Sequence, residues 1–353
     1  MTNTENINAS NIEVGQDLHR GLLSRSLGWL IRGAWLVCQV FLVGWAILAI
    51  YYSNLPSATL RLVLAGAFAA FAFWALWFSR QRHIRALFFL VFLAVLTWWI
   101  FILPSHHRQW RPEVAEMPRA FIDGDNIRIT AVRNFDYRSR DDFDVHYEER
   151  TVQLSHLTDL DFFVSYWSEG LVGHTFLSFI FDNAPPLSIS IETRPEIGEG
   201  FDPLASLFKQ FELIYVVGDE RDLVRVRTNY RKESVYLYHL NTSADSARRL
   251  FVIYLARINQ LAEQPEFYHL LSNSCTINII RYANAAGRKG RFDIRHVLNG
   301  LVDNYLYYSG RLDTSLPFDE LRRRSNIDQA AQAADNAPDF SDRIRASLPR
   351  LPH

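Results

Sequence analysis

The first hundred residues of the chain contain three long apolar runs separated by short polar links. The runs occupy residues 33–52, 60–78 and 86–103. Each is close to the roughly 20 mostly apolar residues that cross a bilayer as a helix. The core of a soluble protein would need three consecutive runs with almost no charge, and a cleaved signal peptide is a single run. We therefore predict three transmembrane helices within residues 1–103.

Basic residues in the links indicate how these helices are oriented, because Lys and Arg of short loops remain on the cytoplasmic side. The link between the second and third runs contains Arg80, Arg82 and Arg85, whereas residues 53–59, between the first and second, contain neither Lys nor Arg. The segment before the first run adds further arginines. The pattern predicts a cytoplasmic N-terminus and a non-cytoplasmic location for everything after the third helix.

The pattern after residue 103 is that of a globular α+β domain, which we expect to extend over residues 104–310. A helix is predicted over residues 243–262, with Ser243 as its N-cap. Alternating apolar residues with β-branched and aromatic content predict strands. These strands are expected at residues 126–135, 145–154, 159–167, 175–181, 187–194, 212–218, 223–230 and 234–240.

Two polar stretches of this second part are predicted from composition. Residues 218–233 carry many charges and are expected to be solvated surface, with binding of phospholipid headgroups as the alternative. Residues 311–353 are mostly polar and are expected to form a C-terminal tail of little fixed structure.

Charge and cysteine content narrow the range of functions. The formal net charge of −1 gives no general attraction to nucleic acid. The chain has only two cysteines, Cys38 within a predicted membrane helix and Cys275 in the second part, so Cys275 has no disulfide partner in its compartment. No Cys or His lies at the spacing of a zinc site, and no motif indicates a cofactor. Cys275 is therefore either a small buried residue or a reactive thiol.

The residues around Cys275 favour the reactive thiol. Asn273 and Ser274 are good N-cap residues, and the pattern that follows predicts a helix that ends at Gly287. Cys275 would lie in the first turn, where the helix dipole stabilises a thiolate and lowers the pKa of the thiol. The free N–H groups of that turn can also bind an oxyanion.

A thiolate needs a base, and His174 is the candidate. It begins the predicted strand TFLSFIF, and the preceding Gly173 would allow a close approach of another group. In the next strand Glu192 or Ser190 could orient the imidazole, although a solvated strand face is an equal alternative. Other histidines remain possible bases, namely His146, His156, His239, His269 and His296.

These residues carry a resemblance to known families. Their order in the chain is His174, then a strand with polar residues, then Cys275 in the setting Asn-Ser-Cys-Thr. This order resembles a circularly permuted papain-like (NlpC/P60) fold, which is also found in lecithin:retinol acyltransferase-like enzymes. The segments GHTFLSFIF, LSISIETR, LFKQFELIYVVGDERDLVRVRTNYR, VYLYHL and FYHLLSNSCTINIIRYA are similar to the DUF4105 family, the domain of bacterial lipoprotein N-acyltransferases. The similarity covers roughly residues 123–308.

The resemblance implies an activity and a location. It implies a bacterial inner-membrane acyltransferase with a periplasmic domain, in which Cys275 is the nucleophile and His174 the base. Glu192 is the candidate third member from the strand pattern, and the resemblance does not decide it because such families vary at that position. The acyl donor would be a membrane lipid or a lipoprotein, the acceptor the N-terminal amine of a lipoprotein, and no cofactor or nucleic acid would take part. Apolar side chains are expected to line the site, with Phe176, Phe179, Tyr166 and Trp167 as candidates.

Two other functions remain open at this point. NlpC/P60 relatives suggest a periplasmic cysteine peptidase or amidase that acts on peptidoglycan. A non-catalytic binding module held at the membrane would leave Cys275 without a chemical role. An acyltransferase should retain an acyl chain on Cys275, and a peptidase should release stem-peptide fragments. A binding module should keep its function in Cys275→Ala.

Overall fold

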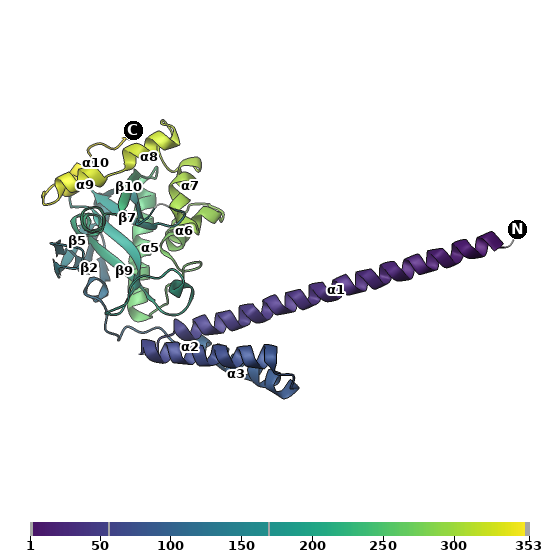
Figure 1. Ribbon diagram of the computed structural model, residues 1–353. Helices are drawn as coiled ribbons and strands as arrows, with labels where there is room; N and C mark the ends of the chain where they lie inside the picture. Colours follow the sequence, from purple (N-terminus) through teal and green to yellow (C-terminus); the bar gives the residue numbers. More distant parts are fainter. Residues whose placement is uncertain (1–2, 56, 169, 350–353) are drawn as a thin grey trace. The chain divides into compact units, whose positions relative to one another are not determined.

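The chain divides into two units, Met1–Ile102 and Leu103–His353. The computed structural model describes residues 3–55, 57–168 and 170–349, with side chains from residue 26 onward. Figure 1 shows the helices of the first unit and the mixed α/β domain that forms the second. Each unit has its own core, and each is described here by itself.

The first unit consists of apolar helices. They are α1 (Asn3–Tyr51), α2 (Ala58–Phe73) continued by the π-helical turn η1 (Trp74–Phe78), and α3 (Arg82–Ile100). Three segments are long and apolar enough to cross a membrane, namely Ser26–Tyr51, Ala58–Phe78 and Arg82–Ile100. The prediction of three such helices is confirmed, with boundaries that differ by a few residues.

Small side chains bring these helices together. Ala46, Ala72 and Ala75 are fully buried and form a cluster with Phe88 of α3. Small residues allow helix backbones to approach closely, which is how helices associate where lipid removes the hydrophobic driving force. The larger side chains of the same helices, such as Phe41 and Leu62, point outward and are exposed.

The second unit is built on an eight-stranded sheet. The strand order is β1-β2-β9-β8-β7-β6-β10, and β5 pairs with β2 off this path. Neighbouring strands are antiparallel except for the single parallel pair of β2 and β9. The strands of the sheet are β1 (Arg119–Asp123), β2 (Asn126–Arg133), β5 (Tyr147–Gln153), β6 (Leu157–Tyr166), β7 (His174–Phe181), β8 (Leu187–Arg194), β9 (Glu212–Asp219) and β10 (Ser234–His239).

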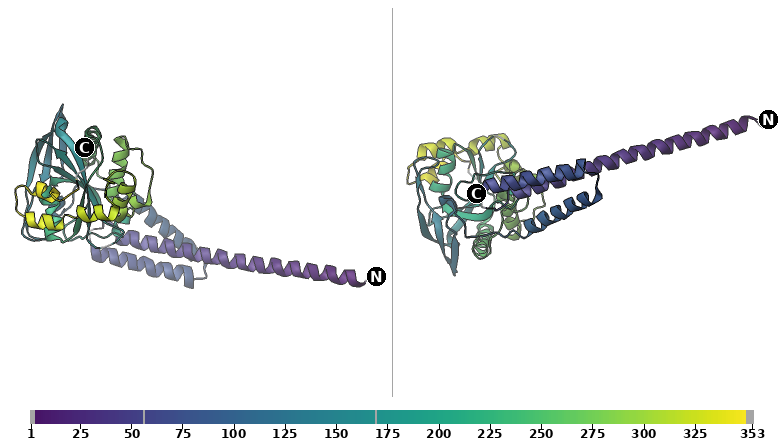
Figure 2. Two further views of the ribbon diagram at one scale, coloured as in Figure 1. Left: turned by 90° about the horizontal axis from the view of Figure 1, so that it is seen from above. Right: turned by 60° about the horizontal axis from the view of Figure 1, so that its bottom comes forward.

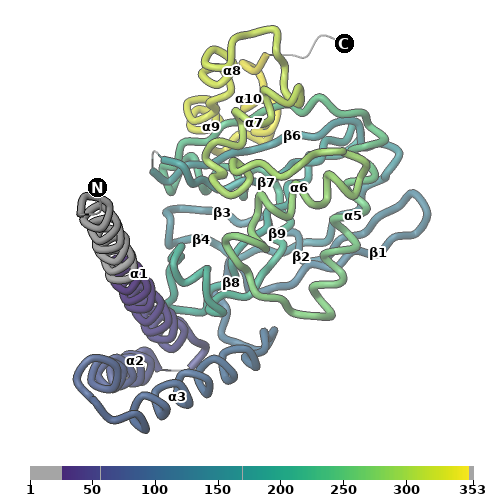
Figure 3. Tube along the Cα trace, turned by 90° about the vertical axis from the view of Figure 1, so that its right-hand side faces the viewer, coloured from purple at the N-terminus to yellow at the C-terminus, as the bar shows by residue number. Residues whose placement is uncertain are grey.

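The predicted helices also occur. Ser243 is the N-cap of α5 (Ala244–Glu263), and its side chain accepts from the N–H of Ser246. The helix α6 (Cys275–Ala285) begins at Cys275 itself. It ends before Gly287, whose φ of 110° is a left-handed conformation that favours glycine, as predicted. Figure 3 shows α5 and α6 next to each other over the strands.

The alternation along β7 separates two packed faces. Phe179 packs against Phe251 and Tyr254 of α5. On the other face Phe176 stacks on Phe163 of β6, with ring centroids 4.6 Å apart. Both phenylalanines are fully buried, so helices cover the sheet on both sides.

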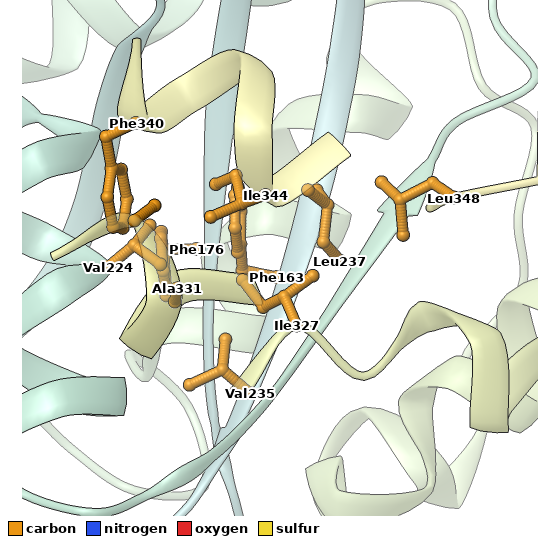
Figure 4. Packing of buried hydrophobic residues seen from close by; sticks show 11 residues of the cluster. Phe163, Phe176, Val224, Val235, Leu237, Ile327, Ala331, Phe340, Ile344 and Leu348 are labelled. Carbon is orange, nitrogen blue, oxygen red and sulfur yellow. The ribbon is translucent and has the colours of Figure 1, made fainter. Parts of the chain in front are cut away.

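The prediction of a C-terminal tail of little fixed structure is wrong, because residues 318–345 fold into helices. They form α8 (Phe318–Ser325), α9 (Asp328–Ala334) and α10 (Phe340–Arg345). Ile327, Phe340 and Ile344 are buried in one cluster with Phe163 and Phe176 of the sheet, as Figure 4 shows. Figure 2 shows these helices in yellow beside the strands. A few apolar side chains at helical spacing are enough because the sheet supplies the rest of the core.

The strand expected at residues 223–230 and the solvated surface expected at residues 218–233 are also wrong. The segment forms the short helix α4 (Glu220–Leu223) and the π-helical turn η5 (Val226–Tyr230). Most of its charged side chains are buried, and the buried ones form ion pairs inside the domain. They are Glu220, Asp222, Arg225, Arg227 and Glu233. Asp222, for example, accepts from Nε and Nη2 of Arg133 at 2.9 and 2.7 Å.

Candidate functional site

Cys275 is the first residue of α6, as the sequence predicted. It is only 2 % exposed. Ser274 is the N-cap residue by its backbone (φ −97°, ψ 173°), but its side chain makes no capping hydrogen bond. The N–H groups of the first turn are therefore not occupied by a capping oxygen of Ser274. A thiolate at this position lies at the positive end of the helix dipole.

His174 begins β7 and is brought to Cys275 by the contact between this strand and α6. The hydroxyls of Thr175 and Thr276, the residues that follow the histidine and the cysteine, are 2.8 Å apart. His174 and Thr175 both act on the Cys275 side chain, and their interactions with it lower the pKa of the thiol. Gly173, just before the strand, lets the chain pass close to β6, because a Cβ there would lie 3.0 Å from the carbonyl oxygen of Ser165.

The pair carries opposite charges at neutral pH. Burial raises the pKa of the Cys275 thiol, but the His174 charge and the hydrogen bonds from His174 and Thr175 lower it more, to about 6. Burial lowers the pKa of His174, yet the carboxylate of Glu192 and the thiolate outweigh it and raise that pKa to about 9. A thiolate–imidazolium pair is the result.

Ser190 and Glu192 both contact the other side of the imidazole. His174 Nε2 is 2.6 Å from Ser190 Oγ and 3.2 Å from Glu192 Oε1. Ser190 Oγ in turn donates to Glu192 Oε1 at 2.7 Å. Since Nε2 has these partners, Nδ1 is the ring nitrogen left for the thiol. The two residues considered as alternatives from the sequence thus act on the ring together.

Behind Glu192 lies a buried arginine that the sequence did not single out. Arg227 Nη2 is 2.7 Å from Glu192 Oε1, and its Nη1 is 3.2 Å from Glu233 Oε2. Ser165 donates to the same Glu233 oxygen at 2.5 Å. Arg227 lies in the charged stretch that was expected to be solvated. The alternation of valine and arginine there gave no signal that the arginines are inside.

A second group missed from the sequence covers the sulfur. Asn299, in the 3₁₀ turn η7 (Asn299–Leu301), has Nδ2 3.7 Å from Cys275 Sγ, and its Oδ1 accepts from the N–H of Gly173 at 3.0 Å. Tyr268 is buried, and its hydroxyl interacts with both the backbone and the side chain of Cys275. Burial raises the pKa of this tyrosine well above its usual value, so it is a neutral donor.

The expected lining residues fall in different places. The Phe176 ring stacks on the His174 ring, with centroids 6.0 Å apart. Tyr166 is buried and donates to the carbonyl oxygen of Gly300, next to Asn299. Phe179 packs against Phe251 of α5, five residues along β7 from His174, so it does not line the site. Trp167 is 46 % exposed and packs edge-on against Phe201.

The other histidines have partners elsewhere. His156 and His239 pair with Asp182 and Asp161, and His269 lies 3.0 Å from the Ser272 hydroxyl. His146 lies near a glutamate on the surface, and His296 packs against a tyrosine ring. Among the residues that the structure describes, no group of three or more His, Cys, Asp or Glu side chains is arranged to hold a metal ion.

One comparison with known protein families finds a match. Residues 143–300 match the family model of the Lnb N-terminal periplasmic domain, a DUF4105-like family of bacterial membrane-associated proteins. The matched range contains Cys275, His174, Glu192 and Arg227. No curated protein and no solved structure matches the chain. The match and the three apolar helices fit a membrane-anchored protein with a periplasmic domain.

Proposed function

We propose that the protein is a cysteine acyltransferase that moves a fatty acyl chain through a Cys275 thioester onto the N-terminal amine of lipoproteins. The observation that carries the proposal is the buried Cys275–His174 pair, in which the pKa of the thiol is lowered to about 6 and that of the imidazole is raised to about 9. Such a pair is a nucleophile with its proton donor already in place. The membrane helices supply the second support, because they keep the domain near lipid donors.

The first step forms the acyl-enzyme. The Cys275 thiolate attacks the carbonyl carbon of an acyl ester, and the electron pair of the C=O bond moves onto oxygen. When the carbonyl re-forms, the C–O bond of the ester breaks, and the departing alkoxide takes the proton of the His174 imidazolium. The products are an acyl thioester, a free alcohol and a neutral imidazole.

The second step transfers the acyl group. A neutral amine attacks the thioester carbon, the neutral His174 takes the proton that the nitrogen loses, and the C–S bond breaks. An amide forms, and the thiolate–imidazolium pair is restored. Water would give hydrolysis by the same route, so the site must exclude it. The burial of Cys275 and the Phe176 ring against His174 serve that exclusion.

Donors for the developing oxyanion come from α6 and from Tyr268. The Tyr268 hydroxyl lies against the Cys275 backbone at the start of the helix, and the backbone donors are the N–H groups of the rest of the first turn. Loss of one such donor typically costs on the order of 10² to 10³ in rate.

The proposal includes a permuted papain-like (NlpC/P60) arrangement. Its support is the order of the parts: the histidine at the start of β7 precedes the polar residues of β8, and the cysteine-bearing helix follows both. The mixed α/β architecture is compatible with that fold class.

The test is to offer the purified full chain a phospholipid with labelled acyl chains and a diacylated lipopeptide. Mass spectrometry should find the acyl chain on Cys275 and then on the peptide amine. Cys275→Ala should lose both, whereas Cys38→Ser, which removes the other cysteine of the chain, should keep both. The acyl-enzyme mechanism would be wrong if the purified protein formed no acyl adduct and cells that contain Cys275→Ala still N-acylated their lipoproteins. Release of stem-peptide fragments from peptidoglycan would assign the same dyad to a peptidase.

A further inference from the structure

A cavity of about 160 Å³ lies beside the Cys275 helix and is not part of the site described above. It is open to solvent on one side and is lined by β6, β7, α5, α6 and α7 (Val302–Tyr308), on the face of the sheet that carries α6. Figure 1 and Figure 3 both show α5 and α6 next to each other at this face. Neither Cys275 nor His174 lines it.

The walls of the cavity are apolar. They are formed by Leu160, Phe162, Leu177, Leu250, Ile279 and Leu306. The volume is close to the about 150 Å³ of apolar cavities that accept small hydrophobic molecules. The polar side chains of Asn241, Thr242 and Ser246 also line this pocket. Water gains little from such walls, so a hydrocarbon segment is the favoured occupant.

The rim of the cavity is cationic. Arg288 and Arg311 are among the lining residues, and the lining contains no Asp or Glu. Nη1 of Arg288 is buried without a hydrogen-bond partner in the described part of the chain. Burial lowers the pKa of this arginine, Tyr305 opposes that effect, and the charge of Arg311 adds to it. Two neighbouring guanidinium groups without a lining carboxylate are an electrostatic match for an anion.

We propose that this cavity is a second lipid site, which holds an alkyl chain between α5, α6 and the sheet and the phosphate at its head on Arg288 and Arg311. An arginine fork matches phosphate geometry, and the apolar walls match the chain. The helices of the first unit keep the domain where phospholipids are abundant. The site does not depend on the acyl transfer proposed for Cys275.

The cavity and the thiol share one helix. Ile279 lies four residues after Cys275, a rise of about 6 Å along α6. A bound chain would therefore pack against the turn of α6 that follows Cys275. This relation gives the site a way to support the Cys275 helix without contact with the reacting atoms.

Binding can be measured on the full chain in a neutral maltoside detergent. The probe is dodecyl phosphate, counted as bound adducts by native mass spectrometry, with dodecanoate and inorganic phosphate as separate arms. One molecule of dodecyl phosphate should bind. Inorganic phosphate should not be retained, because it lacks the chain, and dodecanoate should bind more weakly, because its carboxylate has fewer acceptor oxygens.

Two variants test the two halves of the site. Arg288→Gln with Arg311→Gln should weaken binding by roughly tenfold to a hundredfold, the range for losing charge-assisted hydrogen bonds. Ala283→Phe places a ring among the lining residues and should remove the space for the chain. Arg323→Gln, which removes a charge that is exposed on α8, and Cys275→Ser should bind as the unchanged protein does.

Several results would overturn the proposal. If the double arginine variant and Ala283→Phe both bound dodecyl phosphate as tightly as the unchanged protein does, the amphiphile would bind elsewhere on the chain. Equal retention of inorganic phosphate would leave a simple anion site, and stronger binding of dodecanoate would make the occupant a fatty carboxylate. The double arginine variant alters the charged rim, and Ala283→Phe alters the apolar space. If the melting temperature of one variant shows that it is misfolded, the other still tests the proposal.

Discussion

At the scale of residues, the site is a buried row of alternating charges. The Cys275 thiolate, His174, Glu192, Arg227 and Glu233 follow one another as negative, positive, negative, positive and negative. Arg231 comes next. Its Nη1 lies 3.9 Å from Glu233 Oε1, and its positive charge makes the net charge of the row zero. A buried charge is tolerated only when it is paired, so each member keeps its neighbour ionised.

The first prediction concerns the thiol. In a Cys38→Ser background, the rate of alkylation of Cys275 by iodoacetamide should rise with pH around the lowered pKa of about 6. In His174→Ala the midpoint should move toward the pKa of an ordinary thiol, about 8.5, because the stabilising cation is gone. His156→Ala, on the surface beside Asp182, is the matched control and should change nothing. If the midpoint were the same with and without His174, the imidazole would not stabilise the Cys275 thiolate, and the two residues would not act as a pair.

The second prediction concerns Glu192→Gln. The carboxylate favours the protonated imidazole, so its loss should lower the pKa of His174 from about 9 and, through the weaker imidazolium, raise that of Cys275 from about 6. The ion pair exists between those two values, and the pH range of acyl-adduct formation should therefore narrow from both sides. Glu149→Gln, an exposed change on β5, should leave the profile in place. A uniform loss of rate with an unchanged profile would make Glu192 a packing residue only.

At the scale of elements, the C-terminal helices pack against the face of the sheet on which Phe176 lies beside His174. Arg345 of α10 pairs with Asp161 of β6 at 2.8 Å and with Glu220 of α4 at 2.6 Å. Both carboxylates are fully buried. Phe340, in the same helix, closes the cluster over Phe176, whose ring lies against the imidazole. The site therefore depends on residues that follow it in the sequence.

The third prediction follows from this packing. Phe340→Ala removes a ring that is 1 % exposed and should cost about 3–5 kcal/mol of stability. Melting of the full chain in detergent should occur at a lower temperature, and protease should cut α10 earlier. Phe292→Ala, the same change at a side chain that is 71 % exposed, should shift melting little. Equal melting of the two variants would mean that the C-terminal helices are not part of the cooperative fold.

A glycine makes the fourth prediction. A Cβ at Gly300 would lie 2.7 Å from the carbonyl oxygen of Gly170, and the N–H of Gly300 donates to Leu171 at 2.9 Å. Gly300→Ala should push η7 and Asn299 away from Cys275 and raise the alkylation rate of the covered thiol. Gly310→Ala is unsuitable as a control because of its positive φ, whereas Gly170→Ala has open space around it and should react as the unchanged protein does.

At the scale of the whole molecule, two units with different solvents are joined in one chain. In the first, only between 6 and 28 % of each span is buried inside the protein, and the second has an ordinary core. The first unit thus needs a bilayer for its outward side chains. Arg80, Arg82 and Arg85 lie between its second and third helices, which sets the expected orientation.

The fifth prediction is that orientation. A phosphatase that is active only in the periplasm should be active when fused after His353 and inactive when fused within the link that contains Arg82. The opposite pattern would place Cys275 in the reducing cytoplasm. Replacing the three arginines of the link with alanine should give mixed orientations, because the charge difference between the two sides is then reduced.

The sequence alone determined the features that depend on neighbours in the chain. The apolar helices, most strands and the start of α6 at Cys275 follow from local composition and periodicity, because hydrophobic runs and N-caps act over a few residues. The tertiary structure decided the rest. It brought Ser190 and Glu192 together on His174, buried Arg227 in a stretch that looked like surface, and gave α8–α10 a sheet to fold on. Burial and charge pairing depend on contacts between residues far apart in the chain, such as Arg345 with Asp161, and no local pattern encodes those contacts.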